Sequence, residues 1–399
     1  MKVTGIITEY NPFHLGHKLH LESAKKNTNC DGIVCIMSGN FMQRGMPALI
    51  DKWNRAKIAV LNGVDLVIEL PLVYSISSAE GFAQGAVKIL NSTNIIDYLY
   101  FGAEHDNLKD LCLISKILFD HNHEYTNLLK IELSKGLPFH SARSNALNNI
   151  LGKDFTNILN NSNNILAIEY IKALYKYNSQ IEPKLLKREG ALYNEKNLIT
   201  KYPSATSIRN ALYLDNNIDK LKDSLPIETF DYLNRLNKSN YKFVFSEDTF
   251  DYLKFKILTC GNNLSNIPEA TEGLDNKIIK EIVNSNSLDE LILNIKSKRY
   301  TYTRISRILT SFFIGLENYD VNSICDNSKP YIRPLAFNDV GRKLLKEIKT
   351  NSDVPIITKI PKKNNNMMLN LDLLGTKAYS ILNSSISPYD DYLKSPYYI

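Results

Sequence analysis

The first 110 residues contain four short apolar stretches, and segments with helical spacing lie between them. The clearest stretch is Gly32–Ser38 (GIVCIMS), a continuous apolar run typical of a strand buried on both faces of a sheet. Strands and helices in this order favour a doubly wound, parallel α/β sheet of the Rossmann type. The predicted strands are Lys2–Thr8, Gly32–Ser38, Asp65–Leu70 and Tyr98–Gly102, and the predicted helices are Gly16–Asn27, Lys52–Asn62 and Ala79–Asn91.

The spacing of apolar residues predicts that the rest of the 399 residues is mostly helical, with a short strand near Lys184–Arg188. A chain of this length has room for two to three domains. After about residue 220 no parallel-strand run recurs, and amphipathic segments dominate. We therefore expect a catalytic domain at 1–220 and a mainly helical domain at 221–399. The amphipathic segments are Asn164–Tyr175, Asp275–Val283, Ser287–Ile295, Thr303–Leu316 and Val340–Lys349.

Composition excludes several protein classes. No apolar run approaches the roughly 20 residues of a membrane-spanning helix, and the start MKVTGIITEY has no signal-peptide pattern. We therefore expect a cytoplasmic protein without a membrane partner. The five cysteines are scattered and form no CxxC pair, so no metal site is expected. A formal net charge of +6 permits a nucleic-acid partner but does not require one.

The most informative segment is Gly5–His17 (GIITEYNPFHLGH), in which a predicted strand enters a loop and His14 opens a helix. A helix N-terminus presents unpaired N–H groups and a partial positive charge, which suit a phosphate group. Imidazoles at His14 and His17 add donors that can follow charge developing on a phosphate. Gly16 lets a nucleotide approach the backbone closely. This segment resembles the HxGH signature of the nucleotidyltransferase superfamily; the alternative is a pair of surface histidines at a helix start.

A second segment, Ser204–Arg209 (SATSIR), resembles the S-x-T-x-x-R form found in nucleotidyltransferases. Its hydroxyls and its arginine suit β- and γ-phosphates at a second helix start. Taken alone, the same hexapeptide is more often a helix cap followed by a surface arginine. No KMSKS-like sequence is present, which argues against an aminoacyl-tRNA synthetase.

A third segment, Lys296–Arg307 (KSKRYTYTRISR), contains no acidic residue in its 12 positions. Basic side chains bind a phosphate backbone, and interleaved tyrosines can stack on unpaired bases. The alternative is a solvated helix face with its tyrosines packed inward. Arg44, Arg333, Arg342, Lys343 and Lys346 are weaker candidates. The candidate RNA-binding residues are Lys296, Lys298, Arg299, Arg304 and Arg307.

Longer strings extend the resemblance to one family, the bacterial tRNA(Met) cytidine acetate ligases. They span residues 5 to about 310 and include ITEYNPFHLGH, SGNFMQRGMPA, DKWNRAKIAV, YLYFGAEHDN, LKREGALYN and KRYTYTRISRIL. The resemblance implies an enzyme that activates acetate with ATP and acetylates the wobble cytidine of elongator tRNA(Met), giving N4-acetylcytidine. Mg²⁺ is expected with the triphosphate, although no carboxylate cage for it is visible.

The resemblance also implies an ATP site, with His14 and His17 as its catalytic members. Leu15, Ala103 and Asn194 depart from the family pattern, which puts fine contacts with the ribose and base in doubt. Asn163, or its neighbour Asn164, could equally be a helix N-cap. The implied ATP-binding residues are Ile7, Thr8, Glu9, Tyr10, Asn11, Pro12, Phe13, His14, Leu15, Gly16, His17, Lys18, Leu19, His20, Gly102, Asn163, Arg188, Ser204, Thr206 and Arg209.

Two other functions remain open at this point. An adenylyl- or cytidylyltransferase that makes a small cofactor would share the N-terminal signatures, but it leaves the helical C-terminal half without a role. A non-catalytic RNA-binding protein with a relict nucleotide pocket is the second, and intact histidines argue against it.

Overall fold

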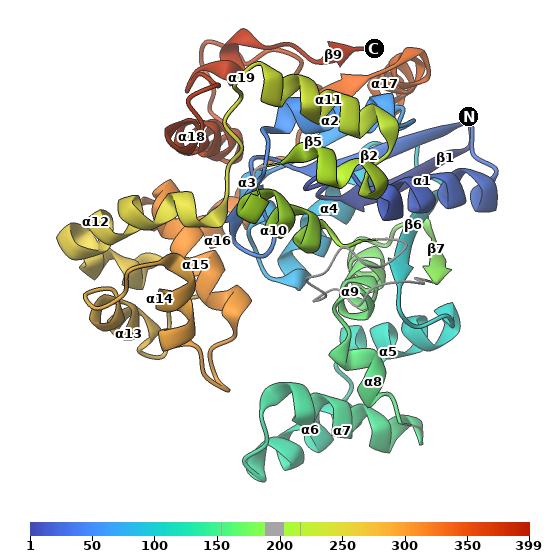
Figure 1. Cartoon of the computed structure of the whole chain (residues 1–399). Coiled ribbons are helices and arrows are strands. Elements are labelled where there is room, and N and C mark those ends of the chain that lie inside the picture. Colours follow the sequence, from blue (N-terminus) through green and yellow to red (C-terminus); the bar gives the residue numbers. More distant parts are fainter. Residues whose placement is uncertain (153, 188–202, 216) are drawn as a thin grey trace.

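A seven-stranded sheet lies at the centre of the molecule, in the strand order β7–β6–β1–β2–β5–β8–β9 (Figure 1). Neighbouring strands run parallel except β5 and β8, which are antiparallel. The computed structural model describes residues 1–152, 154–187, 203–215 and 217–399. The strands are Val3–Thr8 (β1), Gly32–Ser38 (β2), Leu66–Leu70 (β5), Tyr98–Ala103 (β6), Glu182–Lys187 (β7), Pro334–Phe337 (β8) and Tyr397–Tyr398 (β9).

Helices cover both faces of the sheet. Those on one face are Leu15–Thr28 (α1), Lys52–Leu61 (α2), Ala205–Asp215 (α10) and Ile227–Lys238 (α11). Those packed toward the other face are Leu72–Ser75 (α3), Ala79–Ser92 (α4), Ser162–Lys176 (α9), Asp339–Asn351 (α17) and Met367–Leu382 (α18). The short helix Asp390–Leu393 (α19) follows α18.

The hydrophobic cores on both sides of β2 explain why its sequence is apolar throughout. Ile33, Cys35 and Met37 belong to the hydrophobic core beneath α1 and α2. Val34 and Ile36 belong to the core beneath α4 and α9. Successive side chains of a strand point to opposite faces, so a strand covered on both sides needs apolar residues at every position.

The predicted α/β sheet is confirmed. β1, β2, β5 and β6 correspond to the four strands predicted in the first 110 residues, each with bounds within one residue of the prediction. The predicted helices correspond to α1, α2 and α4, and the strand expected near residue 184 is β7. The order β5–β2–β1–β6–β7 reverses direction between β1 and β6, where ligands bind in sheets of this type.

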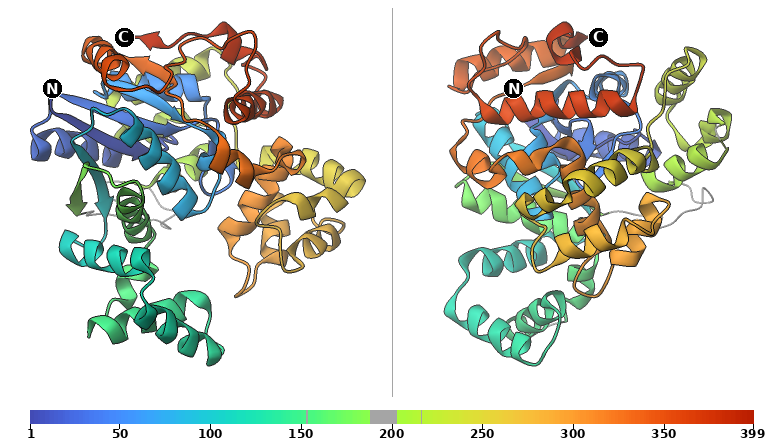
Figure 2. Two further views of the ribbon diagram at one scale, coloured as in Figure 1. Left: turned by 180° about the vertical axis from the view of Figure 1, so that it is seen from behind. Right: turned by 90° about the vertical axis from the view of Figure 1, so that its left-hand side faces the viewer.

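Two groups of helices project from this sheet (Figures 1 and 2). One group lies between β6 and β7 in the sequence, and the other follows α11. No helix in the described ranges is both long enough and apolar enough to cross a bilayer. The first group is Leu108–Asp120 (α5), His123–Ser134 (α6), Phe139–Leu151 (α7) and Thr156–Asn160 (α8), and the second is Phe250–Cys260 (α12), Leu274–Glu281 (α13), Leu288–Ile295 (α14), Tyr302–Ile314 (α15) and Val321–Asn327 (α16).

The C-terminal part of the chain returns to the sheet. β8 pairs with β5, and β9 pairs with β8. The sheet thus takes strands from both sides of residue 220, where the sequence predicts the boundary to a mainly helical domain. β8 has four residues and begins with Pro334, and β9 has two, so neither is long enough to show the alternation that reveals a strand.

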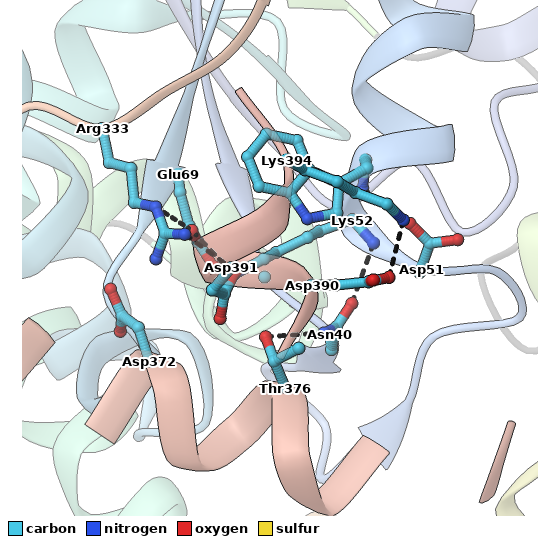
Figure 3. Close-up of polar contacts among 12 residues, drawn as sticks. Asn40, Asp51, Lys52, Glu69, Arg333, Asp372, Thr376, Asp390, Asp391 and Lys394 are labelled. Carbon is cyan, nitrogen blue, oxygen red and sulfur yellow. Dashed lines mark hydrogen bonds and ion pairs between the residues drawn. The ribbon is translucent and has the colours of Figure 1, made fainter. Parts of the chain in front are cut away.

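Five buried ionisable side chains join the sheet to this returning segment (Figure 3). We call Lys52, Glu69, Arg333, Asp372 and Asp391 the buried charge cluster; each is at most 3% exposed. The Lys52 ammonium lies 2.8 Å from carboxylate oxygens of both Glu69 and Asp391. The Arg333 guanidinium lies 2.7 Å from Asp391 and 3.4 Å from Glu69. Arg333 is thus part of the protein interior, and the weak expectation that it contacts RNA is wrong.

The cluster holds three carboxyl groups against two cations. Burial and the nearby Glu69 raise the pKa of Asp372 to about 7, and the Tyr331 hydroxyl and the Leu72 N–H donate hydrogen bonds to it. For Asp391, burial is outweighed by Lys52 and Arg333, which lower its pKa to about 2. Within one cluster, burial thus holds the pKa of Asp372 above the usual range of an aspartate, and the two cations hold that of Asp391 below it.

Candidate active site

The loop between β1 and α1 lies at the carboxyl end of the first strand. Asn11 anchors it, because its Oδ1 accepts a hydrogen bond of 2.7 Å from the Leu49 N–H. Tyr10 adopts a positive φ of 47°, and the Asn11–Pro12 peptide is cis. The loop leads into His14, which is the N-cap of α1.

The two histidines are held by the backbone at the start of α1. His14 Nδ1 accepts a hydrogen bond of 3.0 Å from the Gly16 N–H. His17 Nδ1 lies 3.3 Å from the N–H of His14 and accepts from it. The two rings stack, with centroids 3.7 Å apart and planes inclined by 31°.

These contacts assign the neutral tautomer of both imidazoles. A ring nitrogen that accepts a hydrogen bond carries no proton, so in each neutral ring the proton is on Nε2. Both rings can therefore present an Nε2–H donor, and the helix N-terminus beside them adds its partial positive charge. This combination suits the oxygens of a phosphate group.

Gly16 leaves space for the His14 ring. A Cβ atom at this position would lie 2.9 Å from His14 Cε1 and 3.1 Å from Nδ1. Besides the expected approach of a nucleotide, Gly16 therefore has a second role within the chain, because it leaves room for the His14 ring.

Gly16→Ala is therefore expected to separate stability from activity. Alanine raises the stability of a helical position by up to about 1 kcal/mol, but here it displaces the His14 imidazole, and a misplacement of about 1 Å can lower a rate by about 100-fold. Urea unfolding and ATP turnover measured on the same protein test this. Unchanged turnover would show that the ring position is unimportant.

Two aromatic rings pack against the His17 imidazole. Tyr10 and Phe13 are buried, and their ring centroids lie 4.9 and 5.7 Å from that of His17. Further along α1, the Lys18 ammonium donates to the carbonyl of Asn62, and Leu19 is exposed. Lys18 and Leu19 are thus directed to the protein body and to solvent, whereas His14 and His17 share the loop side.

The second predicted motif, Ser204–Arg209, contacts the loop that carries the two histidines. The Arg209 guanidinium donates a hydrogen bond of 2.7 Å to the carbonyl of Asn11 and one of 3.2 Å to the Thr206 hydroxyl. Ser204 Oγ accepts from the N–H of Ser207 and caps α10. Of the two alternatives for this motif, helix capping holds for Ser204, whereas Arg209 contacts the histidine loop and so lies where phosphate binding would require it.

The end of β6 forms another part of the same edge. Asn163 donates a hydrogen bond of 2.6 Å to Glu104, two residues beyond Gly102. Asn164 is buried, and its Oδ1 accepts from the N–H groups of Glu104 and His105. The alternative that Asn163 is an N-cap is wrong, because Asn163 lies inside the first turn of α9. Arg188 lies outside the described residues.

Sequence reasoning missed Arg55, which is 1% exposed on α2. Its guanidinium donates to the carbonyls of Glu9 (2.6 Å), Ser38 (3.0 Å) and Gly39, at the ends of β1 and β2. Burial lowers the pKa of Arg55. The residue fixes the backbone from which the histidine loop starts, and no local sequence signal marks it.

The basic segment is partly neutralised by acids from a loop distant in the sequence. Arg307 Nε and Nη2 lie 3.0 and 2.6 Å from the Glu269 carboxylate. Arg304 donates two hydrogen bonds to the carbonyl of Glu269. The two arginines share one face of α15, as the spacing predicts, and that face holds an intramolecular ion pair.

Lys296, Lys298 and Arg299 precede α15 and are exposed. Arg299 pairs with Glu272 at 3.1 Å, and the Tyr300 hydroxyl donates to the carbonyl of Glu272. The two lysines are therefore better placed to contact an external phosphate than the arginines.

Comparisons with known proteins agree with this geometry. Residues 1–392 match the family model described as HIGH Nucleotidyl Transferase. The tRNA(Met) cytidine acetate ligase of Clostridium novyi (strain NT) is 50% identical over 402 residues, covering 100% of both chains. That of Clostridium kluyveri is 47% identical over 403 residues, covering 99% of this chain and 98% of its own.

Solved structures are similar over their whole length. The crystal structure of Thermotoga maritima TmcAL without ligand has a TM-score of 0.93 at 33% identity, covering 100% of both chains. The same protein bound with alpha-thio ATP has a TM-score of 0.89 at 32% identity, again covering 100% of both. The chain therefore belongs to the HIGH nucleotidyl transferase family and, within it, to the tRNA(Met) cytidine acetate ligase family of enzymes.

Proposed function

We propose that the protein is an ATP-dependent acetate ligase that acts in two steps. An acetate oxygen attacks the α-phosphorus of ATP, which gives acetyl-adenylate and pyrophosphate. The N4 amine of the wobble cytidine of elongator tRNA(Met) then attacks the acetyl carbonyl, and AMP and a proton leave. The product is N4-acetylcytidine. The names of the relatives and the alpha-thio ATP bound to the Thermotoga protein support this reading.

The observation that carries the proposal is the pair of stacked imidazoles at the start of α1. With their Nδ1 atoms occupied by backbone N–H groups, both rings can donate from Nε2 to phosphate oxygens. Charge increases on these oxygens as the bond to pyrophosphate breaks. Donors already held in place stabilise that charge without reorganisation, which is a large contribution to enzymatic rate enhancement.

Arg209 and Thr206 are proposed to hold the outer phosphates. The hydrogen bond from Arg209 to Asn11 places this cation beside the histidine loop. We further propose that Gly102 and Asn163, at the neighbouring strand end, contact the nucleoside part of ATP. Both assignments depend on the position of these residues at the edge where the strand order reverses.

The described residues contain no group of three side chains suited to hold a metal ion. We therefore propose that Mg²⁺ arrives bound to the triphosphate, where it would neutralise phosphate charge, and we derive no step of the reaction through it.

Mass spectrometry of tRNA nucleosides tests the function directly. Purified protein is incubated with ATP, isotopically labelled acetate and elongator tRNA(Met), and labelled N4-acetylcytidine is expected. A variant tRNA with uridine at the wobble position serves as the control. Absence of labelled product with the wild-type tRNA would contradict the proposal.

Release of pyrophosphate, measured alongside, distinguishes the two other functions. A small-cofactor nucleotidyltransferase would release pyrophosphate with a phosphorylated metabolite and not with acetate. A non-catalytic RNA-binding protein would retain tRNA but release no pyrophosphate at all.

Charge reversal at Lys296 and Lys298 is expected to weaken tRNA binding. Each lost phosphate contact also reduces the salt dependence of binding by about one unit of slope. Lys362→Glu/Lys363→Glu, between α17 and α18, is the matched control, since these lysines are also exposed and have no predicted role in binding. Binding measured at several salt concentrations should separate the two double variants. If both bind as the wild type does, the segment before α15 is only a solvated surface.

A further inference from the structure

A small hairpin connects the histidine loop to helix α15. It consists of Phe41–Met42 (β3) and Met46–Pro47 (β4), and its turn is closed by a hydrogen bond of 2.9 Å from the Gly45 N–H to the Met42 carbonyl. The Phe41 ring packs against Phe313 of α15, with centroids 6.3 Å apart. The hairpin and the neighbouring helix are thus packed as one unit.

On one side the hairpin contacts the loop that carries the histidines. The backbone N–H of Gln43 donates a hydrogen bond of 2.7 Å to the Glu9 carboxylate. The carbonyl of the same Glu9 accepts from the buried Arg55. The Gln43 side chain continues to the carbonyl of Ser77, ahead of α4. This side of the hairpin is therefore fixed to the carboxyl end of β1.

On the other side the hairpin contacts the backbone of α15. The Ser306 hydroxyl donates a buried hydrogen bond of 2.6 Å to the Gly45 carbonyl. Gly45 has a φ of 76°, and a Cβ there would overlap the Arg307 nitrogen and the Ser306 carbonyl carbon. Backbone atoms of a helix cannot move aside as a flexible side chain can, so only glycine permits this approach.

We propose that Gly45 and Ser306 are positioning residues that set the distance between the nucleotide-binding loop and the RNA-binding segment around α15. This inference rests on the proposed function. The groups proposed for adenylation of acetate lie at the carboxyl ends of β1 and β6 and in the first turns of α10, and none of them belongs to the hairpin or to α15. Transfer of the acetyl group also needs the cytidine amine at the acyl carbon, and the bound RNA is located by the segment that leads into α15.

The two steps therefore depend on the hairpin to different degrees. Reacting atoms must approach to about 3–3.5 Å, and a displacement of about 1 Å can lower a rate by about 100-fold. A change at the contact between the hairpin and α15 should accordingly slow acetyl transfer and leave adenylation nearly unchanged.

Gly45→Ala tests this, with Gly273→Ala as its matched control. Gly273 has a similar φ of 81°, but a Cβ there would have no neighbour within 4 Å, so it adds the same backbone strain without a collision. Adenylation is measured by acetate-dependent exchange of pyrophosphate into ATP, and transfer by single-turnover acetylation of tRNA. For Gly45→Ala we expect transfer to fall at least about tenfold with exchange close to that of the wild type. Gly273→Ala should change neither step.

Ser306→Ala provides a second test that adds no volume and so remains informative if Gly45→Ala does not fold. It should also slow transfer more than exchange. The inference is overturned if both steps fall by the same factor, or if neither changes in Ser306→Ala. Failure of the proposed function gives a different result: the wild-type protein itself would then show no acetate-dependent exchange of pyrophosphate into ATP.

Discussion

Replacing His17 by alanine should lower acetate-dependent pyrophosphate release by at least about 100-fold, the usual effect of removing one donor from a developing oxyanion. His14→Ala should have a similar effect. Each substitution removes an imidazole whose Nδ1 accepts a hydrogen bond from a backbone N–H at the start of α1. Binding of tRNA should remain, because the basic segment before α15 is built from other residues. Pyrophosphate release and a tRNA gel-shift assay on the same preparations measure both properties.

His14 also caps α1, so its removal has a cost in stability of about 0.5–2 kcal/mol. His14→Asn separates the two roles. An asparagine side-chain oxygen can accept from the Gly16 N–H and preserve the cap, but it supplies no donor at the Nε2 position. We expect His14→Asn to be stable and nearly inactive. The assignment of the two imidazoles fails if either alanine variant turns over at a rate close to that of the wild type.

Lys52→Met should lower the free energy of unfolding by about 3–5 kcal/mol, the loss found when one partner of a buried ion pair is removed. The Lys52 ammonium contacts Glu69 and Asp391 at 2.8 Å and is 1% exposed. Without it, two buried carboxylates share the single cation Arg333. Urea unfolding at neutral pH measures the change. Arg342→Met is the control, because the pair of Arg342 with Asp339 is exposed and should contribute little.

The dependence on pH provides a second check on the same cluster. Although burial opposes ionisation, the neighbouring cations lower the pKa of Asp391 to about 2. Its stabilising contribution is therefore present above the pKa of an unfolded aspartate, about 4, and is lost as the pH falls through 2. Lys52→Met removes one of these cations, so its acid-unfolding midpoint should move to higher pH. The same midpoint in both proteins would mean that the cluster contributes nothing to acid stability.

The central strands could be predicted because their environment is uniform. Every residue of Gly32–Ser38 is buried, so an apolar run identifies the strand without knowledge of its neighbours. Helix α1 was equally clear, since its signal lies within about a dozen residues. The histidines and SATSIR were found for the same reason: helix-start chemistry is local in sequence. That Arg209 contacts Asn11 could be expected only from the resemblance.

The missed features all depend on contacts between distant parts of the chain. Arg55 looks like any arginine on a helix, and only the fold shows three strand-end carbonyls around it. Lys52 and Asp391 are separated by most of the sequence, and neither carries a local sign that it is buried. The acidic partners of the basic segment could not be predicted, because Glu269 and Glu272 lie outside it.

The late pairing of β8 with β5 has a consequence for synthesis on the ribosome. Leu70 and Pro334 are 264 positions apart, and translation at about 5–20 residues per second needs roughly 13–53 s to cover that distance. During this interval the edge of β5 has no partner strand, and its sequence LVIEL is of the kind that pairs with other chains. The nascent protein therefore passes through a period in which this edge can pair with other chains, and slower translation would lengthen that period.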